Sequence, residues 1–268
     1  MLRMIQIDKS FNIGTINEKQ IFKGLNLTIH DGDFITVIGG NGAGKSTMLN
    51  LIAGVHKADG GRIILDGEDL TYKNETQRAK YIGRVFQDPM MGTAPTMMIE
   101  ENLAMAYRRT KRRTLAWGIS QKERELYRAS LAQLGLGLED RMKTKVGLLS
   151  GGQRQALTLL MATLVTPKLL LLDEHTAALD PATAEKVLEL TKSIVAEKKI
   201  TCLMVTHNMH QALELGNRTL MMDAGRIVFD VKGEERKKMT VDDLLEKFRE
   251  NAGKQLDNDR ILLSKVEG

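Results

Sequence analysis

Residues 39–46 have the composition and order of a phosphate-binding loop. Their sequence, GGNGAGKS, fits the pattern G-x-x-x-x-G-K-[ST], and an apolar run at residues 34–38 predicts a buried strand immediately before it. Glycines let the backbone turn so that successive N–H groups point at one anion, and the N-terminus of the helix predicted next adds its dipole. A glycine-rich turn without a ligand is the alternative. We predict contacts to a bound nucleoside triphosphate from Gly39, Asn41, Gly42, Ala43, Gly44, Lys45, Ser46 and Thr47.

Two of these side chains, and two carboxylates further along the chain, predict metal-assisted hydrolysis. Lys45 is expected to reach the β- and γ-phosphates, and Ser46 to bind Mg²⁺, which prefers oxygen ligands. The apolar strand predicted at residues 169–172 ends in Asp173 and Glu174, at the sheet edge where open α/β folds bind ligands. We expect Asp173 to hold Mg²⁺ through water and Glu174 to act as general base toward the attacking water. Solvated acids at a strand end are the alternative.

A third motif chooses among the nucleoside triphosphatases that share the first two, which include kinases, GTPases and helicases. Residues 149–155, LSGGQRQ, resemble the LSGGQ signature of the ABC ATPase family, which stands just before the second acidic strand. Serine and glycines at a helix N-terminus can bind a phosphate. In this family the phosphate belongs to nucleotide held by the other subunit of a dimer. The resemblance assigns that role to Ser150, Gly151, Gly152 and Gln153.

Four further positions match motifs of the same family. Gln87 matches the Q-loop glutamine, which contacts Mg²⁺ or water and hinges the helical lobe. Asp180 matches the D-loop residue that reaches across the dimer, and His207 matches the switch histidine that contacts the γ-phosphate. Phe11 aligns with the aromatic residue that stacks on adenine. The loop after Phe11 is longer than usual, and packing in the core is the alternative for this residue.

One position departs from the family pattern. His175 follows Glu174, where the family usually has proline. A histidine there would stand beside the proposed base, and we expect it to be a neutral side chain at the surface. The resemblance covers roughly residues 1–232 and leaves the C-terminal tail outside it.

The elements that must position these residues alternate between strand and helix patterns. A hairpin is predicted over residues 219–231, with its turn at residues 223–225. Gly54 ends the first predicted helix, and Thr240 with Asp243 caps the last one. The predicted strands are residues 2–8, 24–30, 34–38, 61–65, 81–86, 169–172 and 200–205, and the predicted helices are residues 45–53, 99–109, 122–134, 152–164 and 181–197.

The predicted fold is α/β, a P-loop NTPase (RecA-like) core with an antiparallel β subdomain and an inserted α-helical subdomain. The ABC ATPase domain covers residues 1–232, with its core at about 1–87 and 150–232 and the helical subdomain at about 88–149. Residues 233–268 are predicted to form a C-terminal helix and a tail, which is polar from about residue 251 and expected to be loosely ordered.

The composition is ordinary for a soluble globular protein, with 42% hydrophobic and 27% charged residues. No stretch approaches the roughly 18 apolar residues of a membrane span. The N-terminal residues 1–8 alternate like a strand and lack the apolar region of a signal peptide. We therefore expect a cytoplasmic protein that acts on a membrane only through a partner. Cys202, the single cysteine, lies in an apolar run and is expected to be a buried structural thiol.

Part of the formal net charge of +5 lies in the basic run of residues 108–113. A solvated basic face is the simplest interpretation. Attraction to anionic lipid or to the loops of a membrane protein is a second one. Nucleic-acid binding is disfavoured, because aromatic residues make up only 4% of the chain and no stacking motif accompanies the charge.

Within the family, the sequence favours a transporter motor over the ATPases that do other work. Translation factors carry two ATPase units, chromosome ATPases insert a long coiled coil, and repair ATPases carry cysteine zinc modules, none of which this sequence shows. A cluster-assembly ATPase stays open as an alternative. A chain without a fused membrane domain is typical of importers, and an exporter subunit is the other possibility.

The resemblance also implies partners. It implies a homodimer around two ATP molecules, integral membrane permease subunits, and a separate substrate-binding protein, with the ATPase peripheral on the cytoplasmic face of the cell membrane. Residues 87–95 and 173–181 look like those of bacterial amino-acid uptake systems of the tryptophan or tyrosine type. We predict that the permease docks in a groove lined by about residues 88–109, which includes the methionine-rich residues 90–98. The alternative is that these methionines fill the core of the helical lobe.

Overall fold

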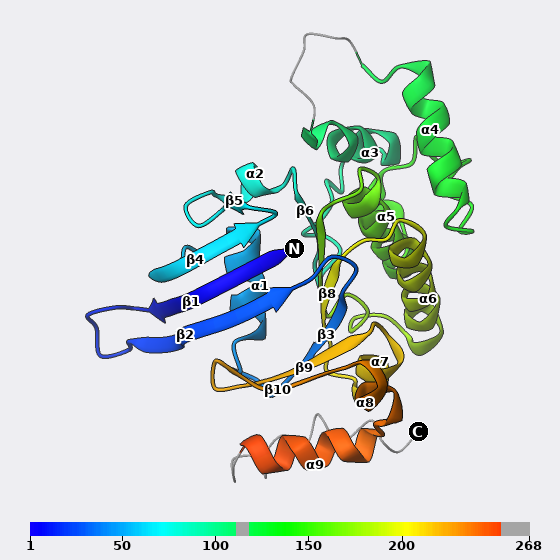
Figure 1. Cartoon of the computed structure of the whole chain (residues 1–268). Coiled ribbons are helices and arrows are strands. Elements are labelled where there is room, and N and C mark those ends of the chain that lie inside the picture. Colours follow the sequence, from blue (N-terminus) through cyan, green and yellow to red (C-terminus); the bar gives the residue numbers. More distant parts are fainter. Residues whose placement is uncertain (111–117, 253–268) are drawn as a thin grey trace. The chain divides into compact units, whose positions relative to one another are not determined.

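The computed structural model describes residues 1–110 and 118–252, and the chain divides into two compact units (Figure 1). The first unit comprises Met1–Arg78 and the chain from Thr201 onward, and the second comprises Ala79–Ile200. Residues 111–113 of the basic run and nearly all of the predicted loose tail lie outside the described residues. The subdomain boundaries proposed from the sequence stay a prediction.

One sheet of the first unit is antiparallel and forms the predicted β subdomain. Its strands run in the order β2-β1-β4-β5. β1 buries Leu2, Met4 and Ile7, and an irregularity between Met4 and Ile7 shifts the alternation by one residue. β2 begins five residues earlier than predicted, because its pairing with β1 continues to Phe11 opposite Lys19 before the hairpin closes. The strands are β1 (Leu2–Phe11), β2 (Lys19–Ile29), β4 (Gly60–Leu65) and β5 (Glu68–Asp69).

The other strands of the first unit surround β3 (Phe34–Ile38), whose five residues are all buried. β8 (Cys202–Val205) and β9 (Arg218–Asp223) lie parallel to β3 on either side, and β10 (Arg226–Lys232) continues from β9 as an antiparallel hairpin. The apolar run of β3 therefore suits a central strand. Its carboxyl end leads directly into the glycine-rich loop.

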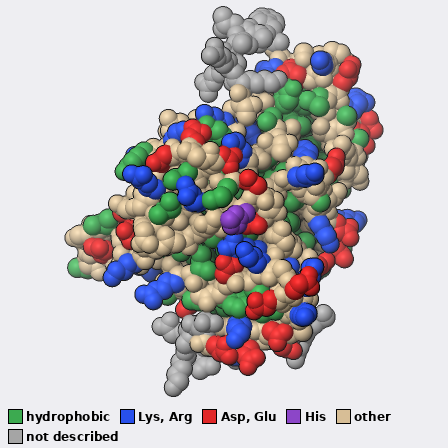
Figure 2. Space-filling model, in the orientation of Figure 1, with side chains coloured by type: hydrophobic (Ala, Val, Ile, Leu, Met, Phe, Trp, Pro, Cys, Tyr) green, Lys and Arg blue, Asp and Glu red, His purple; other side chains and the backbone are tan. Residues whose placement is uncertain are grey.

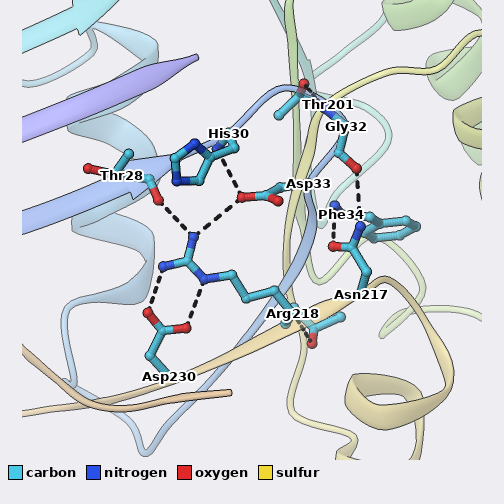
Figure 3. Close-up of polar contacts among 10 residues, drawn as sticks. Thr28, His30, Gly32, Asp33, Phe34, Thr201, Asn217, Arg218 and Asp230 are labelled. Carbon is cyan, nitrogen blue, oxygen red and sulfur yellow. Dashed lines mark hydrogen bonds and ion pairs between the residues drawn. The ribbon is translucent and has the colours of Figure 1, made fainter. Parts of the chain in front are cut away.

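Polar contacts fix the opposite end of β3, where the chain enters the sheet (Figure 3). The Arg218 guanidinium donates to both carboxylate oxygens of Asp230, at 2.8 and 2.6 Å, and to the Thr28 carbonyl at 2.7 Å. The Asn217 side chain accepts from the Phe34 N–H at 3.0 Å. The bidentate ion pair raises the pKa of Arg218. These contacts hold the start of β3 against β9. They therefore fix the strand whose other end leads into the glycine-rich loop.

Helices of the first unit cover these sheets. α1 ends at Gly54 (φ 84°), as predicted from the glycine. Three short helices were not predicted from the sequence, since four to six residues give too little periodicity to recognise. The helices are α1 (Lys45–Ala53), α2 (Glu75–Arg78), α7 (Met209–Glu214), α8 (Gly233–Lys238) and α9 (Val241–Ala252).

The last described helix, α9, begins at the predicted cap. The Thr240 N–H donates to the Asp243 carboxylate at 2.7 Å, and the Asp243 N–H donates to the Thr240 hydroxyl at 3.2 Å. Leu244 and Phe248 are buried in a cluster with Ile38 of β3. Acidic side chains gather on the outer side of α9 (Figure 2). The helix is therefore amphipathic and packed on the unit that carries the loop.

The second unit joins two parallel strands to the predicted helical lobe. β6 pairs with β7 in the register Val85 opposite Leu172. A buried cluster that includes Leu103, Tyr127 and Leu157 holds three of its helices together. The elements are β6 (Ile82–Val85), β7 (Leu169–Asp173), α3 (Ile99–Tyr107), α4 (Gln121–Ala132), α5 (Gly151–Thr163) and α6 (Pro181–Glu197), with 3-10 turns at Arg108–Thr110 and Val146–Leu148.

No helix within residues 1–110 and 118–252 is both long and apolar enough to cross a bilayer. Cys202 is fully buried in β8, and burial raises the pKa of its thiol, as expected for a structural cysteine.

Candidate functional site

The loop between β3 and α1 has the backbone that phosphate binding requires. Gly42 and Gly44 have φ values of 80° and 100°, in the left-handed region that favours glycine. A Cβ on Gly44 would lie 2.8 Å from the Phe22 ring, and one on Gly39 would lie 2.2 Å from the Met222 carbonyl oxygen. These glycines are therefore fixed both by conformation and by close packing.

Donor groups converge on this loop. The Lys45 side chain folds back along it, and its Nζ donates to the Gly39 and Gly40 carbonyls at 2.7 and 2.9 Å. Gly44 is the N-cap of α1 and has no side chain to occupy the first N–H groups of the helix. No acidic residue lies in the first turn of α1, and Ser46 is exposed there. A helix N-terminus of this kind suits an anion, and phosphate binding by the predicted loop residues stays a prediction.

His207 leaves the sheet of the first unit at the same edge as the loop. The parallel register pairs Val37 with Val205, and the Thr206 N–H donates to the Val37 carbonyl at 3.1 Å. His207 is half-buried beyond this point. Asn208 then caps α7 by accepting from the Gln211 N–H at 3.1 Å. The end of β8 is therefore well fixed on both sides of the histidine.

Phe11 lies at the end of β1 and is half-buried, so it does not belong to the buried core. The edge of its ring meets the His56 ring at 5.2 Å between centroids and an interplanar angle of 78°. The Lys9 ammonium lies 5.2 Å from the Phe11 centroid. The structure thus disfavours the core alternative, and the role of Phe11 toward adenine stays a prediction.

The two acidic residues of the second unit follow β7 and differ in their surroundings. Asp173 is half-buried and pairs with Arg84 of the neighbouring strand β6 at 3.3 Å. The Arg84 guanidinium also lies over the Phe86 ring, 4.5 Å from its centroid. Glu174 has a φ of 46°, a left-handed conformation that is uncommon for a residue with a side chain. Such strain is concentrated at functional sites, where the surrounding structure maintains it.

His175 is buried, which corrects the expectation of a surface position. Its side chain is 1% exposed, and its Nε2 lies 3.0 Å from the Thr191 hydroxyl oxygen on α6. Burial lowers the pKa of His175 to about 4, which favours the neutral form at neutral pH. The ring lies against α6, where Thr191 provides a polar partner that the sequence pattern does not reveal.

Gln87 emerges beyond the carboxyl end of β6 and is exposed. β6 and β7 are parallel neighbours, so Gln87, Asp173 and Glu174 all leave the sheet of the second unit at one edge. The Phe86 carbonyl accepts from the Gln155 side chain on α5 at 3.3 Å. This contact joins the residue before Gln87 to the helix that begins with the signature motif.

The signature motif forms the N-terminus of α5. The Ser150 hydroxyl accepts from the Gln153 N–H at 3.3 Å, and the Ser150 N–H donates to the Gln153 side chain at 3.2 Å. A Cβ on Gly152 would lie 2.1 Å from a methyl carbon of Thr183. Asp180 caps α6 by accepting from the Thr183 N–H at 3.1 Å. The signature and the predicted D-loop residue are therefore neighbours within the second unit.

Sequence reasoning missed Arg84 and Thr191, and it recognised His175 only as a departure from the family pattern. A mid-strand arginine or a mid-helix threonine gives no signal of its own. Only the burial and the hydrogen bonds reveal them.

The donors present fit Mg²⁺ that arrives with a triphosphate. Within the described part of the chain, no group of three or more His, Cys, Asp or Glu side chains is arranged to hold a metal ion. Mg²⁺ is commonly held by one or two protein oxygens together with substrate phosphates and water. The exposed Ser46 hydroxyl and the Asp173 carboxylate are oxygen donors of this kind.

Comparison with known proteins gives consistent matches. The family model for ABC transporter domains matches residues 22–177. A tyrosine transport ATP-binding protein from Clostridioides difficile is 46% identical over 248 residues, which cover 92% of this chain and 98% of that protein. A spermidine/putrescine import ATP-binding protein from Haemophilus ducreyi is 37% identical, over 80% of this chain and 54% of that protein. The chain thus spans about half the length of the second relative.

Solved structures are similar over most of the chain. A dimeric ATP-binding cassette in a post-hydrolysis state, bound to ADP and inorganic phosphate, has a TM-score of 0.74 at 28% identity and covers 87% of this chain and 98% of its own. An ADP-bound cassette of an ABC transporter has the same TM-score and identity and covers 92% of this chain and 98% of its own.

Proposed function

Because the chain belongs to the ABC transporter ATPase family, we propose that it is the ATP-hydrolysing subunit of an importer. The observation that carries the proposal is the loop at residues 39–46, where left-handed glycines and Lys45 surround the uncapped N-terminus of α1. That arrangement binds the phosphates of ATP through N–H groups and one cation.

The nucleotide and the metal share this loop in the proposal. Lys45 exchanges its two carbonyl partners for the β- and γ-phosphates when ATP binds. Ser46 and Asp173 would hold Mg²⁺ in this arrangement. When bound, Mg²⁺ supplies positive charge that offsets the charge of the phosphates. Phe11 offers a ring face to adenine, which does not read the edge of the base.

Hydrolysis follows from the residues at the two strand ends. Glu174 accepts a proton from water while the water oxygen bonds to the γ-phosphorus. The bond from that phosphorus to the bridging oxygen breaks, and ADP and inorganic phosphate are the products. His207 contacts the γ-phosphate. Gln87 would contact the water or the metal, and it connects the nucleotide site to the helical lobe.

We propose that the active form is a homodimer around two ATP molecules. Ser150, Gly151, Gly152 and Gln153 of each subunit bind the γ-phosphate of nucleotide held by the partner, and Asp180 reaches across the interface. The solved dimeric cassette with ADP and phosphate supports this arrangement. The reciprocal Ser150–Gln153 cap presents the signature glycines at the start of α5, where such a phosphate would bind.

The dimer drives membrane permease subunits from the cytoplasmic face, with a separate substrate-binding protein delivering the cargo. Met90 and Met91 are 39% and 69% exposed, so they do not fill the core of the helical lobe. Their exposure supports the proposed docking region at about residues 88–109. The name of the Clostridioides difficile relative favours an aromatic amino acid as cargo.

The experiment compares phosphate release from Mg-ATP by the full chain and by Glu174→Gln. The amide keeps the shape of the side chain but cannot accept the proton, so turnover should fall about 10²–10⁴-fold while ATP binding persists. Glu189→Gln, at an exposed position of α6, is the matched control and should hydrolyse normally. Normal turnover by Glu174→Gln would refute the assignment of the base.

A further inference from the structure

A buried histidine stands directly after the proposed base, and none of the roles proposed above uses it. The His175 side chain is 1% exposed, and its Nε2 lies 3.0 Å from the Thr191 hydroxyl oxygen on α6. Both residues belong to the second unit, as does Glu174. A polar ring buried away from water needs a role that repays the loss of its hydration.

The hydrogen bonds fix the direction of this contact. The Thr191 hydroxyl donates its single proton to the Val187 carbonyl at 2.7 Å. His175 must therefore carry its proton on Nε2 and donate it to Thr191. The Nδ1 atom is then an acceptor, and it is buried without a hydrogen-bond partner among the described residues. An unpaired buried acceptor lowers stability, so an apolar side chain would serve simple packing better.

The anchored ring adjoins a strained residue. Glu174 has a φ of 46°, which a non-glycine residue keeps only where its surroundings hold it. The peptide that follows Glu174 is attached through His175 to Thr191, in the middle of α6. Glu174, the proposed base, is thus linked to α6 through its peptide bond to His175 and the hydrogen bond from His175 to Thr191.

The same helix supports the residues proposed to face the partner subunit. Asp180 caps α6 by accepting from the Thr183 N–H, and Thr183 packs so closely on Gly152 that a Cβ there would lie 2.1 Å from its methyl carbon. α6 therefore contacts the start of the signature helix at one end and His175 near its middle.

We propose that His175 is a positioning residue, which ties the backbone of Glu174 to α6 through its Nε2–H bond to Thr191. The base then keeps one place relative to Asp180 and the signature glycines. The side-chain hydrogen bond thereby restricts the backbone at this position. The inference rests on the proposed role of Glu174.

Four variants of the full chain test the proposal, with kcat, KM for ATP and Tm measured for each. His175→Leu removes both ring nitrogens, and Thr191→Val removes the acceptor while keeping the shape. Both should lower kcat at least about tenfold, since small displacements of a catalytic group have large effects, and should leave KM within about twofold. His175→Gln restores an N–H near Nε2, and Thr191→Ser restores the hydroxyl. Both should return kcat to within about threefold of the wild type.

The Tm separates positioning from packing. His175→Leu also removes the unpaired Nδ1, so its Tm should not fall even though its kcat does. Wild-type kcat in His175→Leu would overturn the proposal. A loss of kcat that follows a loss of Tm and is not rescued by His175→Gln would also overturn it. If His175→Leu does not fold, the Thr191→Val and Thr191→Ser pair decides by the same criteria.

Glu174→Gln in the same assay distinguishes failure of the proposed base from failure of the positioning role of His175. Normal turnover by Glu174→Gln removes the proposed base and this inference with it. An inactive Glu174→Gln beside fully active His175→Leu and Thr191→Val contradicts the positioning role alone.

Discussion

At the scale of single residues, the burial of His175 makes the stability of the protein depend on pH. Burial lowers the pKa of folded His175 to about 4, below the roughly 6.5 of an unperturbed histidine, so the unfolded chain takes up this proton more readily. The stabilising contribution is complete above about pH 6.5 and is lost as the pH falls from there toward 4.

We expect the free energy of unfolding to fall by about 2–3 kcal/mol between pH 7.5 and pH 4.5 on account of this residue. Urea unfolding of the wild type and of His175→Leu, at both pH values and without nucleotide, measures the difference. The variant should lose less stability than the wild type by that amount. Equal losses in the two proteins would mean that His175 is accessible to protons in the folded state.

Residues that belong to motifs could be predicted one by one from the sequence, and residues that support them could not. Lys45 and Ser150 are recognised by their neighbours in the chain. His175 was recognised as a departure from the family pattern, but its burial depends on Thr191, sixteen positions away on another element. Arg84 and Asp173 are likewise paired only through the register of two strands.

At the scale of elements, a buried arginine holds the C-terminal end of the helix that follows the phosphate loop. Arg78 is 1% exposed, and it donates to the Leu51 and Ile52 carbonyls of α1 at 2.7 and 2.8 Å and to the Lys73 carbonyl at 2.8 Å. Burial lowers the pKa of Arg78 to about 10, so it stays charged at neutral pH and complements the helix dipole.

Replacing Arg78 with lysine should therefore destabilise the first unit. A lysine offers a single ammonium in place of the planar fork, and several carbonyls would lose their donors. We expect a loss of about 2–4 kcal/mol, measured by chemical denaturation. The control is Arg62→Lys at an exposed position of β4, which should change stability by less than about 0.5 kcal/mol. Similar stabilities for the two variants would contradict a capping role for Arg78.

The elements that could be predicted are those whose own residues mark where they begin and end. α6 (Pro181–Glu197) and β3 (Phe34–Ile38) have the predicted bounds, because a capping aspartate with proline marks the helix and an unbroken apolar run marks the strand. The early start of β2 depends on its partner strand, and α7 and α8 are too short for a periodic signal. The bounds of such elements depend on strand pairing and on packing between elements, which a local sequence pattern does not contain.

At the scale of the whole molecule, the exposed methionines should matter for transport more than for ATP hydrolysis. Aspartate at Met90 or Met91 would bury a charge in an apolar permease contact, which costs at least the roughly 1.4 kcal/mol that equals tenfold in binding. We expect ATPase activity of the isolated subunit within about twofold of the wild type, and transport by the assembled system reduced at least about tenfold. Tyr72→Asp, at an 84% exposed position of the first unit, is the control. Normal transport by both methionine variants would place the docking surface elsewhere.

The family and the fold class could be predicted from three short motifs, because the resemblance rests on the order and spacing of a few residues. The cargo could not be predicted in the same way. In the proposed arrangement other subunits contact the transported molecule, so no side chain of the ATPase encodes the choice.

The central claim is an ATPase whose sites are completed by a second subunit, and mixing two inactive variants tests it most directly. Lys45→Ala disables the loop that holds ATP, and Ser150→Arg blocks the signature that faces the partner's ATP. Each alone should be inactive. A mixed dimer retains one intact site, so an equal mixture should recover up to about a quarter of wild-type phosphate release. Lys45→Ala mixed with Ser46→Ala, two defects in one loop, should recover none. If the first mixture also stays inactive at concentrations where mixed dimers demonstrably form, the shared site is wrong.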